Sequence, residues 1–196
     1  MAAPIKLNLK IYQGSTFKQV LRWESSTKVY VPITNINKSA PLVITAPAHG
    51  IPVGWRAKAT NVGGMKEVNL LDYNTVTSTT TDTATFNQVN SLAFTTYTSG
   101  GVLEYNLPVS LVNLKARMQI REKLTSSTFV HEMTTENGGV IFDTTYKTIT
   151  LFIDDTTTAG FSFNSGVYLL EFENTISGET TPFAKGSVSL EREVTR

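Results

Sequence analysis

The residues of this chain that could do chemistry are few and separated in sequence. Catalysis usually needs a nucleophile with a base, or paired carboxylates, in a fixed arrangement. Serine and aspartate are plentiful enough to leave a Ser-His-Asp site open by composition, but no G-x-S-x-G elbow or comparable motif accompanies the only two histidines, His49 and His131. We expect His49, followed by Gly50 at a strand end, to satisfy a backbone group in a turn. We expect His131 to lie on the polar face of a strand, and we predict no catalytic residue and no enzyme.

The sequence also predicts no metal site and no cofactor. Asp154 and Asp155, with Asp143 upstream, lack the fixed spacing of a calcium or magnesium loop, so a turn or helix cap explains them better. The glycine pairs do not open helices, as a phosphate-binding loop must, and are typical of turns. Because the chain has no Cys, disulfides, thiolate nucleophiles and cysteine zinc sites are excluded.

The clearest candidate for binding is a basic stripe formed by Lys115, Arg117 and Arg121 on one face of an alternating segment. Two interpretations stay open. The stripe is either a solvated face balanced by neighbouring acids, or a contact with an acidic neighbouring subunit. The balancing acids would be Glu122, Glu132 and Glu136.

Trp23 and Trp55 and a threonine-rich stretch, 75–86, are the other candidate interface features. Each tryptophan is most simply a core anchor, but an exposed one would be a candidate interaction hot spot. The threonine-rich stretch is either the solvent face of a hairpin or a low-charge surface that pairs with other chains.

The segments that must position these residues alternate apolar and polar side chains with a period of two, which predicts half-buried β-strands. Residues 167–172 contain few polar side chains, and we expect a central strand covered on both faces. One or two helical turns are expected near 154–160, capped by Asp154 or Asp155. The alternating segments are 5–12, 17–23, 115–121, 129–133, 140–142, 148–153 and 183–191.

Composition narrows the class of protein further. Of 196 residues, 17 are Lys or Arg, 16 are Asp or Glu and 30 are Thr, which leaves a formal net charge of +1. Such a balance gives nucleic-acid binding no support. Lys6 and Lys10 interrupt the N-terminal segment, and no apolar run approaches a membrane span, so we expect neither a signal peptide nor a membrane partner.

The middle of the chain differs from its flanks, because it holds four of the seven prolines and short strands between glycine and proline turns. Such a pattern suggests a small barrel. We therefore predict an all-β fold in which an outer β-domain, residues 1–31 with 106–196, is interrupted by an inserted β-module, residues 32–105.

The inserted module resembles the first catalytic-cysteine half-domain of ubiquitin-activating enzymes, a small β-barrel. The resemblance covers ITAPAHGIPVGWRAKATNVGGMKEVN, and SGGVLEY resembles the closing strand of that module. It implies a barrel fold and, because the chain has no Cys, no ubiquitin chemistry. The matching positions are His49, Gly50, Gly54, Gly64, Met65 and Asn69.

The flanking parts resemble a family of small virion proteins of tailed bacteriophages, whose domain is similar to the N-terminal β-sandwich of phage baseplate upper proteins. The resemblance rests on IYQGSTFKQVLRW, ARMQIREK, TTENGG and GVYLLEFE, and on a C-terminal Gly-x-Val strand that leads to Glu-Val-Thr. These motifs include Gln13-Gly14, Gly186-Ser187-Val188 and Glu193-Val194-Thr195-Arg196.

The two resemblances together imply a non-enzymatic structural protein of a tailed phage particle, assembled in the cytoplasm of the bacterial host and located in the virion. The expected fold is a β-sandwich, Ig-like or similar to baseplate proteins, with the barrel inserted. Expected partners are tail, neck or capsid subunits and other copies of the chain. A tail, baseplate or head–tail junction adaptor or a fibre-bearing accessory is the first hypothesis, capsid decoration the second, and a carbohydrate-binding module the third.

Overall fold

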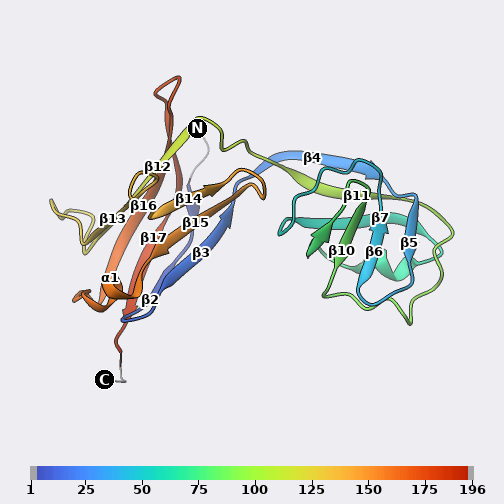
Figure 1. Cartoon of the computed structure of the whole chain (residues 1–196), viewed down its shortest axis with the longest axis horizontal. Helices are drawn as coiled ribbons and strands as arrows, with labels where there is room; N and C mark the ends of the chain where they lie inside the picture. Colours follow the sequence, from blue (N-terminus) through green and yellow to red (C-terminus); the bar gives the residue numbers. More distant parts are fainter. Residues whose placement is uncertain (1–3, 194–196) are drawn as a thin grey trace. The chain divides into compact units, whose positions relative to one another are not determined.

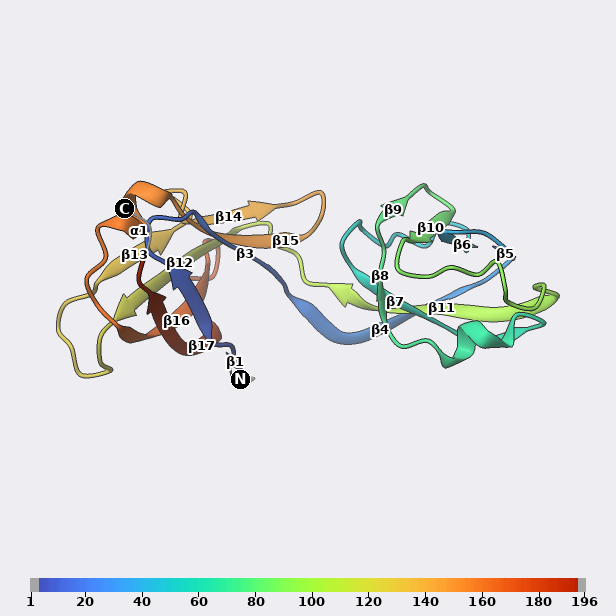
Figure 2. The ribbon, with the colours of Figure 1, turned by 90° about the horizontal axis from the view of Figure 1, so that it is seen from below.

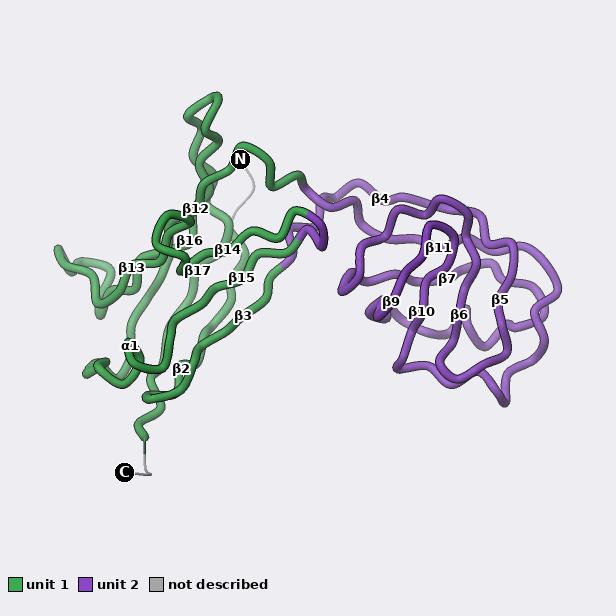
Figure 3. The backbone as a smooth tube through the Cα atoms, in the orientation of Figure 1, with its two compact units in different colours: residues 1–21, 110–144, 148–196 green, residues 22–109, 145–147 purple. Residues whose placement is uncertain are grey.

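The computed structural model describes residues 4–193, and within them the regular secondary structure is almost entirely β-strand. The chain divides into two compact units (Figure 3). Unit 1 comprises residues 1–21, 110–144 and 148–196, and unit 2 comprises residues 22–109 and 145–147. The insertion expected at 32–105 is therefore longer in the structure. The reason is that the strands Glu24–Pro32 and Ser99–Pro108 pair with each other over nearly their whole length, so both belong to unit 2.

The larger sheet of unit 1 has the strand order β1-β17-β16-β12-β13, and β2 also pairs with β17. The last four strands of this order run antiparallel to their neighbours, whereas β1 and β2 run parallel to β17. In Figure 2 the blue strand β2 lies beside the dark red strand β17, with which it pairs. The strands are β1 (Ile5–Lys6), β2 (Leu9–Tyr12), β12 (Leu114–Arg121), β13 (His131–Thr134), β16 (Ser165–Asn174) and β17 (Thr180–Glu191).

A smaller sheet of order β14-β15-β3 covers the inner face of the larger one (Figure 1). Its strands are β3 (Phe17–Arg22), β14 (Val140–Asp143) and β15 (Thr148–Ile153). The side chains of the two sheets meet between them, where the ring of Phe142 lies 5.8 Å from that of Phe172. The short helix α1 (Asp155–Ala159) follows β15, and the Asp154 carboxylate accepts the backbone N–H of Thr157 at 2.7 Å, which confirms the expected cap.

Unit 2 has a separate apolar core, in which Trp55, Met65 and Leu103 are among the most buried side chains. One sheet has the order β4-β11-β7-β8 and another the order β5-β6-β10-β9. The strands are β4 (Glu24–Pro32), β5 (Asn35–Asn37), β6 (Leu42–Thr45), β7 (Arg56–Gly63), β8 (Asn74–Thr75), β9 (Ser78–Thr79), β10 (Thr83–Phe86) and β11 (Ser99–Pro108), and a 3-10 helix, η1, spans Lys66–Leu70.

The structure corrects the expectation for the strand at 167–172 and shows where the threonine-rich stretch lies. The strand at 167–172 lies in the centre of its sheet, but only one face is covered, because Leu169 is 38% exposed while Leu170 is fully buried. In the threonine-rich stretch, Val76, Ala84 and Phe86 enter the core of unit 2 and the threonines lie half-buried or exposed. Among the described residues no helix is long and apolar enough to cross a membrane.

Candidate functional site

The face of the larger sheet that points away from the core of unit 1 gathers the basic stripe predicted from the sequence. Along β12 every second side chain is buried, beginning with Ala116, so the odd-numbered residues point outward. The same alternation along β16 and β17 exposes Leu169 and Lys185. We call this surface the outer face. Its residues are Lys115, Arg117, Gln119, Arg121, Glu132, Thr134, Val167, Leu169, Glu171, Glu173 and Lys185.

Two members of the basic stripe are balanced by acids of the same chain. Arg117 Nη2 lies 3.6 Å from Glu171 Oε2, and Lys115 Nζ lies 3.4 Å from Glu136 Oε1. Both pairs are exposed to solvent, so each contributes at most about 1 kcal/mol to folding. The charges therefore remain available for contacts with another molecule.

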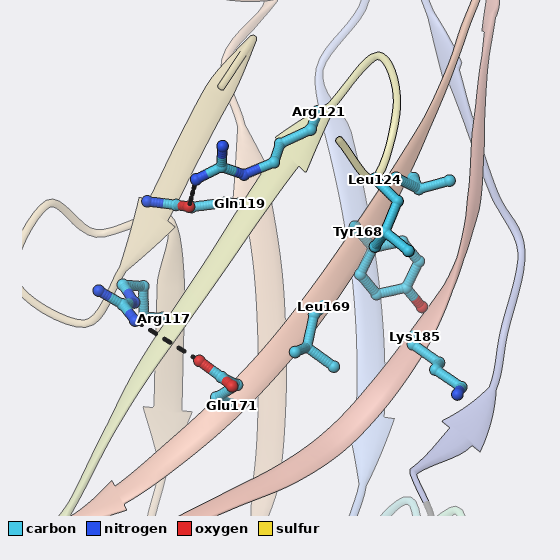
Figure 4. Close-up of a pocket in the computed structure, with 9 residues that line it drawn as sticks. Arg117, Gln119, Arg121, Leu124, Tyr168, Leu169, Glu171 and Lys185 are labelled. Carbon is cyan, nitrogen blue, oxygen red and sulfur yellow. Dashed lines mark hydrogen bonds and ion pairs between the residues drawn. The ribbon is translucent and has the colours of Figure 1, made fainter. Parts of the chain in front are cut away.

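Arg121 is held differently from the other two basic residues. Its guanidinium donates to the Ser126 carbonyl at 2.5 Å and to Gln119 Oε1 at 2.7 Å, as Figure 4 shows for the second bond. The first bond anchors the loop after β12, where Leu124 is 88% exposed. Arg121 thus fixes one end of the outer face rather than offering a free charge.

The outer face is grooved rather than flat. One groove of about 280 Å³ runs between β12 and β17, with Leu169 in its floor, Arg117 and Arg121 on one side and Lys185 on the other (Figure 4). A second groove, of about 250 Å³, shares Arg117 with it and continues toward Lys115. Lys185 has no ion-pair partner among residues 4–193. An outside molecule can reach this ammonium group.

Glu136, at the end of the basic stripe, has a lowered pKa and so favours its charged form. Hydrogen bonds from its own backbone and from the Thr135 hydroxyl, with further help from Lys115, lower the pKa of Glu136. Glu132 accepts a hydrogen bond of 2.6 Å from Gln119 Nε2. The outer face consequently carries fixed charges of both signs at neutral pH.

His131 does not lie on the polar face of its strand, which corrects that expectation. In β13 the outward positions are Glu132 and Thr134, opposite Gln119 and Arg117, so His131 points inward. Its ring lies 5.5 Å from the ring of Phe161. Burial lowers the pKa of His131, although Asp154 and Glu132 act in the opposite direction.

His49 lies in a turn of unit 2, as the sequence predicted. The imidazole is 2% exposed, and its Nδ1 accepts the backbone N–H of Ile51 at 3.0 Å, which places the proton of the neutral ring on Nε2. The His49 carbonyl accepts the Tyr105 hydroxyl at 2.7 Å. Gly50 follows with a φ of +66°, a conformation that glycine adopts without strain.

Three further motif positions of the insertion, Gly64, Met65 and Asn69, lie in a second turn after β7. Gly64 has a φ of +78°, and a Cβ there would lie 2.3 Å from the Thr96 carbonyl oxygen. Met65 is fully buried in the core of unit 2. The Asn69 side chain accepts the Val62 N–H at 2.8 Å and donates to the Val62 carbonyl at 2.9 Å. Gly64 and Asn69 thus stabilise the backbone of the turn, and Met65 packs in the core of unit 2.

The two tryptophans do not join the basic stripe. Trp55 is 1% exposed, and its indole N–H donates to the Tyr146 carbonyl at 2.7 Å, which confirms the expected core anchor and makes the alternative, an exposed interface residue, wrong for Trp55. Its size and apolarity made it the main anchor of the core of unit 2. Trp23 is half-buried in the same unit, where its carbonyl accepts the N–H of Val109.

Sequence reasoning missed the acidic and apolar part of the outer face. Val167, Leu169, Glu171 and Glu173 alternate with buried residues in β16, and the two glutamates at odd positions were the signal that one side of this strand is exposed. Lys185 lies in the alternating segment 183–191, but that pattern does not distinguish it from the other exposed residues of the strand. The structure places these residues of β16 and Lys185 on the same face as the basic stripe.

A second charged network lies in unit 2. Lys28 Nζ donates to the Tyr73 hydroxyl at 2.9 Å and lies 3.0 Å from Glu104, while Tyr73 donates to the same carboxylate. The hydrogen bond from Tyr73, with help from Lys28, lowers the pKa of Glu104. Each charge is satisfied within the chain, so the network stabilises the sheet locally and leaves no open group.

No protein-family model matches the chain, and no curated protein matches it either.

Proposed function

We propose that this protein is a non-enzymatic structural component of a tailed phage virion, in which unit 1 is a β-sandwich that anchors the chain to the particle. Its place is the tail, the baseplate or the head–tail junction, as an adaptor or fibre-bearing accessory. The mechanism is geometric: a symmetric scaffold presents many docking sites, and repeated copies make modest single contacts persistent.

The observation that carries the proposal is that two of the motifs on which the phage resemblance rests, Gln13-Gly14 and Glu193, lie against one another in unit 1, although they come from opposite ends of the chain. The Gln13 amide donates to the Phe161 carbonyl at 2.9 Å, and the Glu193 N–H donates to Gln13 Oε1 at 3.4 Å. Gly14 has a φ of +73°, and a Cβ there would lie 2.5 Å from the Glu193 carboxylate. The motif positions Val194, Thr195 and Arg196 lie outside the described residues.

The Gly186 motif supports the same proposal. A Cβ at Gly186 would lie 2.0 Å from the Leu7 carbonyl oxygen, so only glycine lets the chain between β1 and β2 pass this close. The Ser187 N–H donates to Asn8 Oδ1 at 3.2 Å, and the Tyr168 hydroxyl donates to the Leu7 carbonyl at 2.7 Å. Motif residues from the two ends of the chain therefore meet in one joint along an edge of β17, where β1 and β2 pair parallel to that strand.

The outer face of unit 1 gives the proposed anchor a docking surface. It combines exposed aliphatic side chains with charges of both signs, a composition suited to a polar contact between proteins. Capsid decoration is the second candidate, because the same surface would suit a lattice of shell subunits. Trp55 offers no platform for a sugar ring, since it is buried.

A low-resolution cryo-electron microscopy map of the parent particle tests the proposal. The all-β chain should be located at the tail or neck, in a number of copies set by the rotational symmetry there. Density only on the shell would select capsid decoration instead. A particle with no density for the chain, at a stage when the infected cell contains the protein, would overturn both.

A further inference from the structure

The outer face carries a charge pattern that reverses sign across its own midline. The register places residues of neighbouring strands side by side at the same height. At one height the order from β13 to β17 is Glu132, Gln119, Leu169, Lys185. An acid therefore lies at one edge and a base at the other, on either side of the line between β12 and β16.

The next two rows of residues along the strands show the same change of charge sign between β12 and β16. Arg117 of β12 lies beside Glu171 of β16, and Lys115 lies beside Glu173. On each row β12 supplies the base and β16 the acid. At the far end of the face the uncharged Val167 lies beside Arg121.

We infer that the outer face pairs with the same face of a second copy of this chain, about a two-fold axis that runs parallel to the strands between β12 and β16. Such a rotation lays β12 of one copy over β16 of the other, and β13 over β17, at unchanged height. Arg117 then faces Glu171 of the second copy, and Lys115 faces its Glu173. Every contact occurs twice, because the interface is isologous.

The outer rows also match under this rotation. Glu132 of one copy faces Lys185 of the other, and Gln119 covers the exposed Leu169. Arg121 meets Val167 of the second copy, so no row opposes two charges of the same sign. Leu124, which is 88% exposed, lies beside the groove whose floor contains Leu169 and adds aliphatic surface.

A second copy fits this face better than an acidic neighbouring subunit does. An acidic partner would meet Glu132, Glu171 and Glu173 as well as the basic stripe, and like charges in a contact cost several kcal/mol. The role of this pairing in particle assembly rests on the proposed function, which it makes more specific by assigning the contact between copies to a defined surface. The pairing itself does not depend on a particle and can be measured on the purified chain.

The size of the face sets the strength of association to expect. Three strands spaced about 4.8 Å apart, each contributing about eight residues at about 3.3 Å, together with the four residues of β13, cover on the order of 400–500 Å² per copy. Two copies would bury on the order of 1,000 Å², the lower limit for a specific interface. We expect a weak dimer in solution that repetition in an assembly would strengthen.

Reversing the charge at Glu132 or Lys185 tests the pairing cleanly. The two residues lie three strand spacings apart, about 14 Å, so they cannot form an ion pair within one chain. In Glu132→Lys two lysines face each other at both ends of the dimer, and in Lys185→Glu two glutamates do. In a mixture of the two variants, each contact of the heterodimer again joins a base and an acid.

The experiment is sedimentation velocity on the full chain over a concentration series that reaches about 1 mM, because an interface of this size belongs to weak encounters. We expect dimers of the natural chain, a dissociation constant at least about tenfold higher for each variant alone, and recovery in the equimolar mixture. Lys66→Glu, an exposed reversal in unit 2, is the control and should leave the dimer unchanged.

Circular dichroism should show the same fold for all four proteins, since every altered side chain is partly or fully solvent-accessible. A natural chain that stays monomeric throughout the series would overturn the inference. So would a dimer that both single reversals leave intact, or a mixture that fails to recover. The experiment uses no phage particle. Its failure would refute the self-pairing alone, whereas absence of the chain from the virion would refute the proposed function.

Discussion

The side-chain amide of Asn69 holds the backbone of Val62 by both its polar groups, accepting the N–H at 2.8 Å and donating to the carbonyl at 2.9 Å. Val62 lies near the end of β7, whereas β8 pairs with that strand only at Arg56 and Ala57. Asn69 therefore supplies hydrogen bonds that a neighbouring strand would otherwise make. The motif position that suggested a barrel thus stabilises the inserted unit directly.

Replacing Asn69 by Ala should destabilise unit 2 by about 2–4 kcal/mol, because two backbone groups of a buried residue lose their partner. Both tryptophans, Trp23 and Trp55, lie in unit 2, so intrinsic fluorescence during urea unfolding reports on that unit. The exposed Asn87→Ala is the matched control and should leave the midpoint unchanged. Equal midpoints for the two variants would refute the role of Asn69.

Gly64 and Gly54 form a matched pair for a test of close packing in unit 2. Both have positive φ values, +78° and +84°, so either Gly→Ala change costs about 1–2 kcal/mol from backbone strain. Only at Gly64 would the new Cβ also meet backbone atoms, whereas at Gly54 nothing lies within 4 Å. We expect Gly64→Ala to cost about 1–3 kcal/mol more than Gly54→Ala. Tryptophan fluorescence during thermal unfolding would reveal the difference, and its absence would count against the described turn.

Gln13→Ala should loosen the chain after α1. The amide of Gln13 donates to the carbonyls of Ala159 and Phe161, so its loss should cost about 1 kcal/mol and speed amide exchange near α1. Hydrogen exchange with mass spectrometry measures this segment separately from unit 2. The exposed Gln88→Ala is the control, and identical exchange curves near α1 for both variants would contradict the proposed joint.

The acid sensitivity of unit 1 should depend on His131. Burial lowers the pKa of this imidazole below its ordinary value of 6.5, so the folded state favours the neutral ring. Its contribution to stability is therefore fully present above pH 6.5 and is lost as the pH falls through the folded pKa. His131→Gln should flatten the dependence of unfolding free energy on pH in this window, measured by circular dichroism of urea unfolding. An unchanged slope would show that His131 does not titrate differently on unfolding.

The all-β class and most strands could be predicted from the sequence because one face of each strand is buried, which imposes a period of two. The alternation of Ala116 and Met118 with Arg117 identified β12 and the outward direction of the basic stripe. The cap at Asp154 could be predicted because a carboxylate before a short helix accepts free amides.

The rest depended on contacts between distant parts of the chain. Glu171 joins Arg117 only through the pairing of β12 with β16, and no local pattern encodes which strands become neighbours. The inward direction of His131 follows from its position opposite Ile120, which places it with the buried side chains. For the two tryptophans the sequence favoured a core position but left an interface open, because size and apolarity serve both.

Quantitative mass spectrometry of gradient-purified phage particles decides whether this protein is a component of the virion. We expect peptides from both units of the chain to remain with the particles through purification, at a fixed ratio to known tail or shell proteins. If the peptides are found in the infected cell but never with the particles, the protein is not a structural component of the virion.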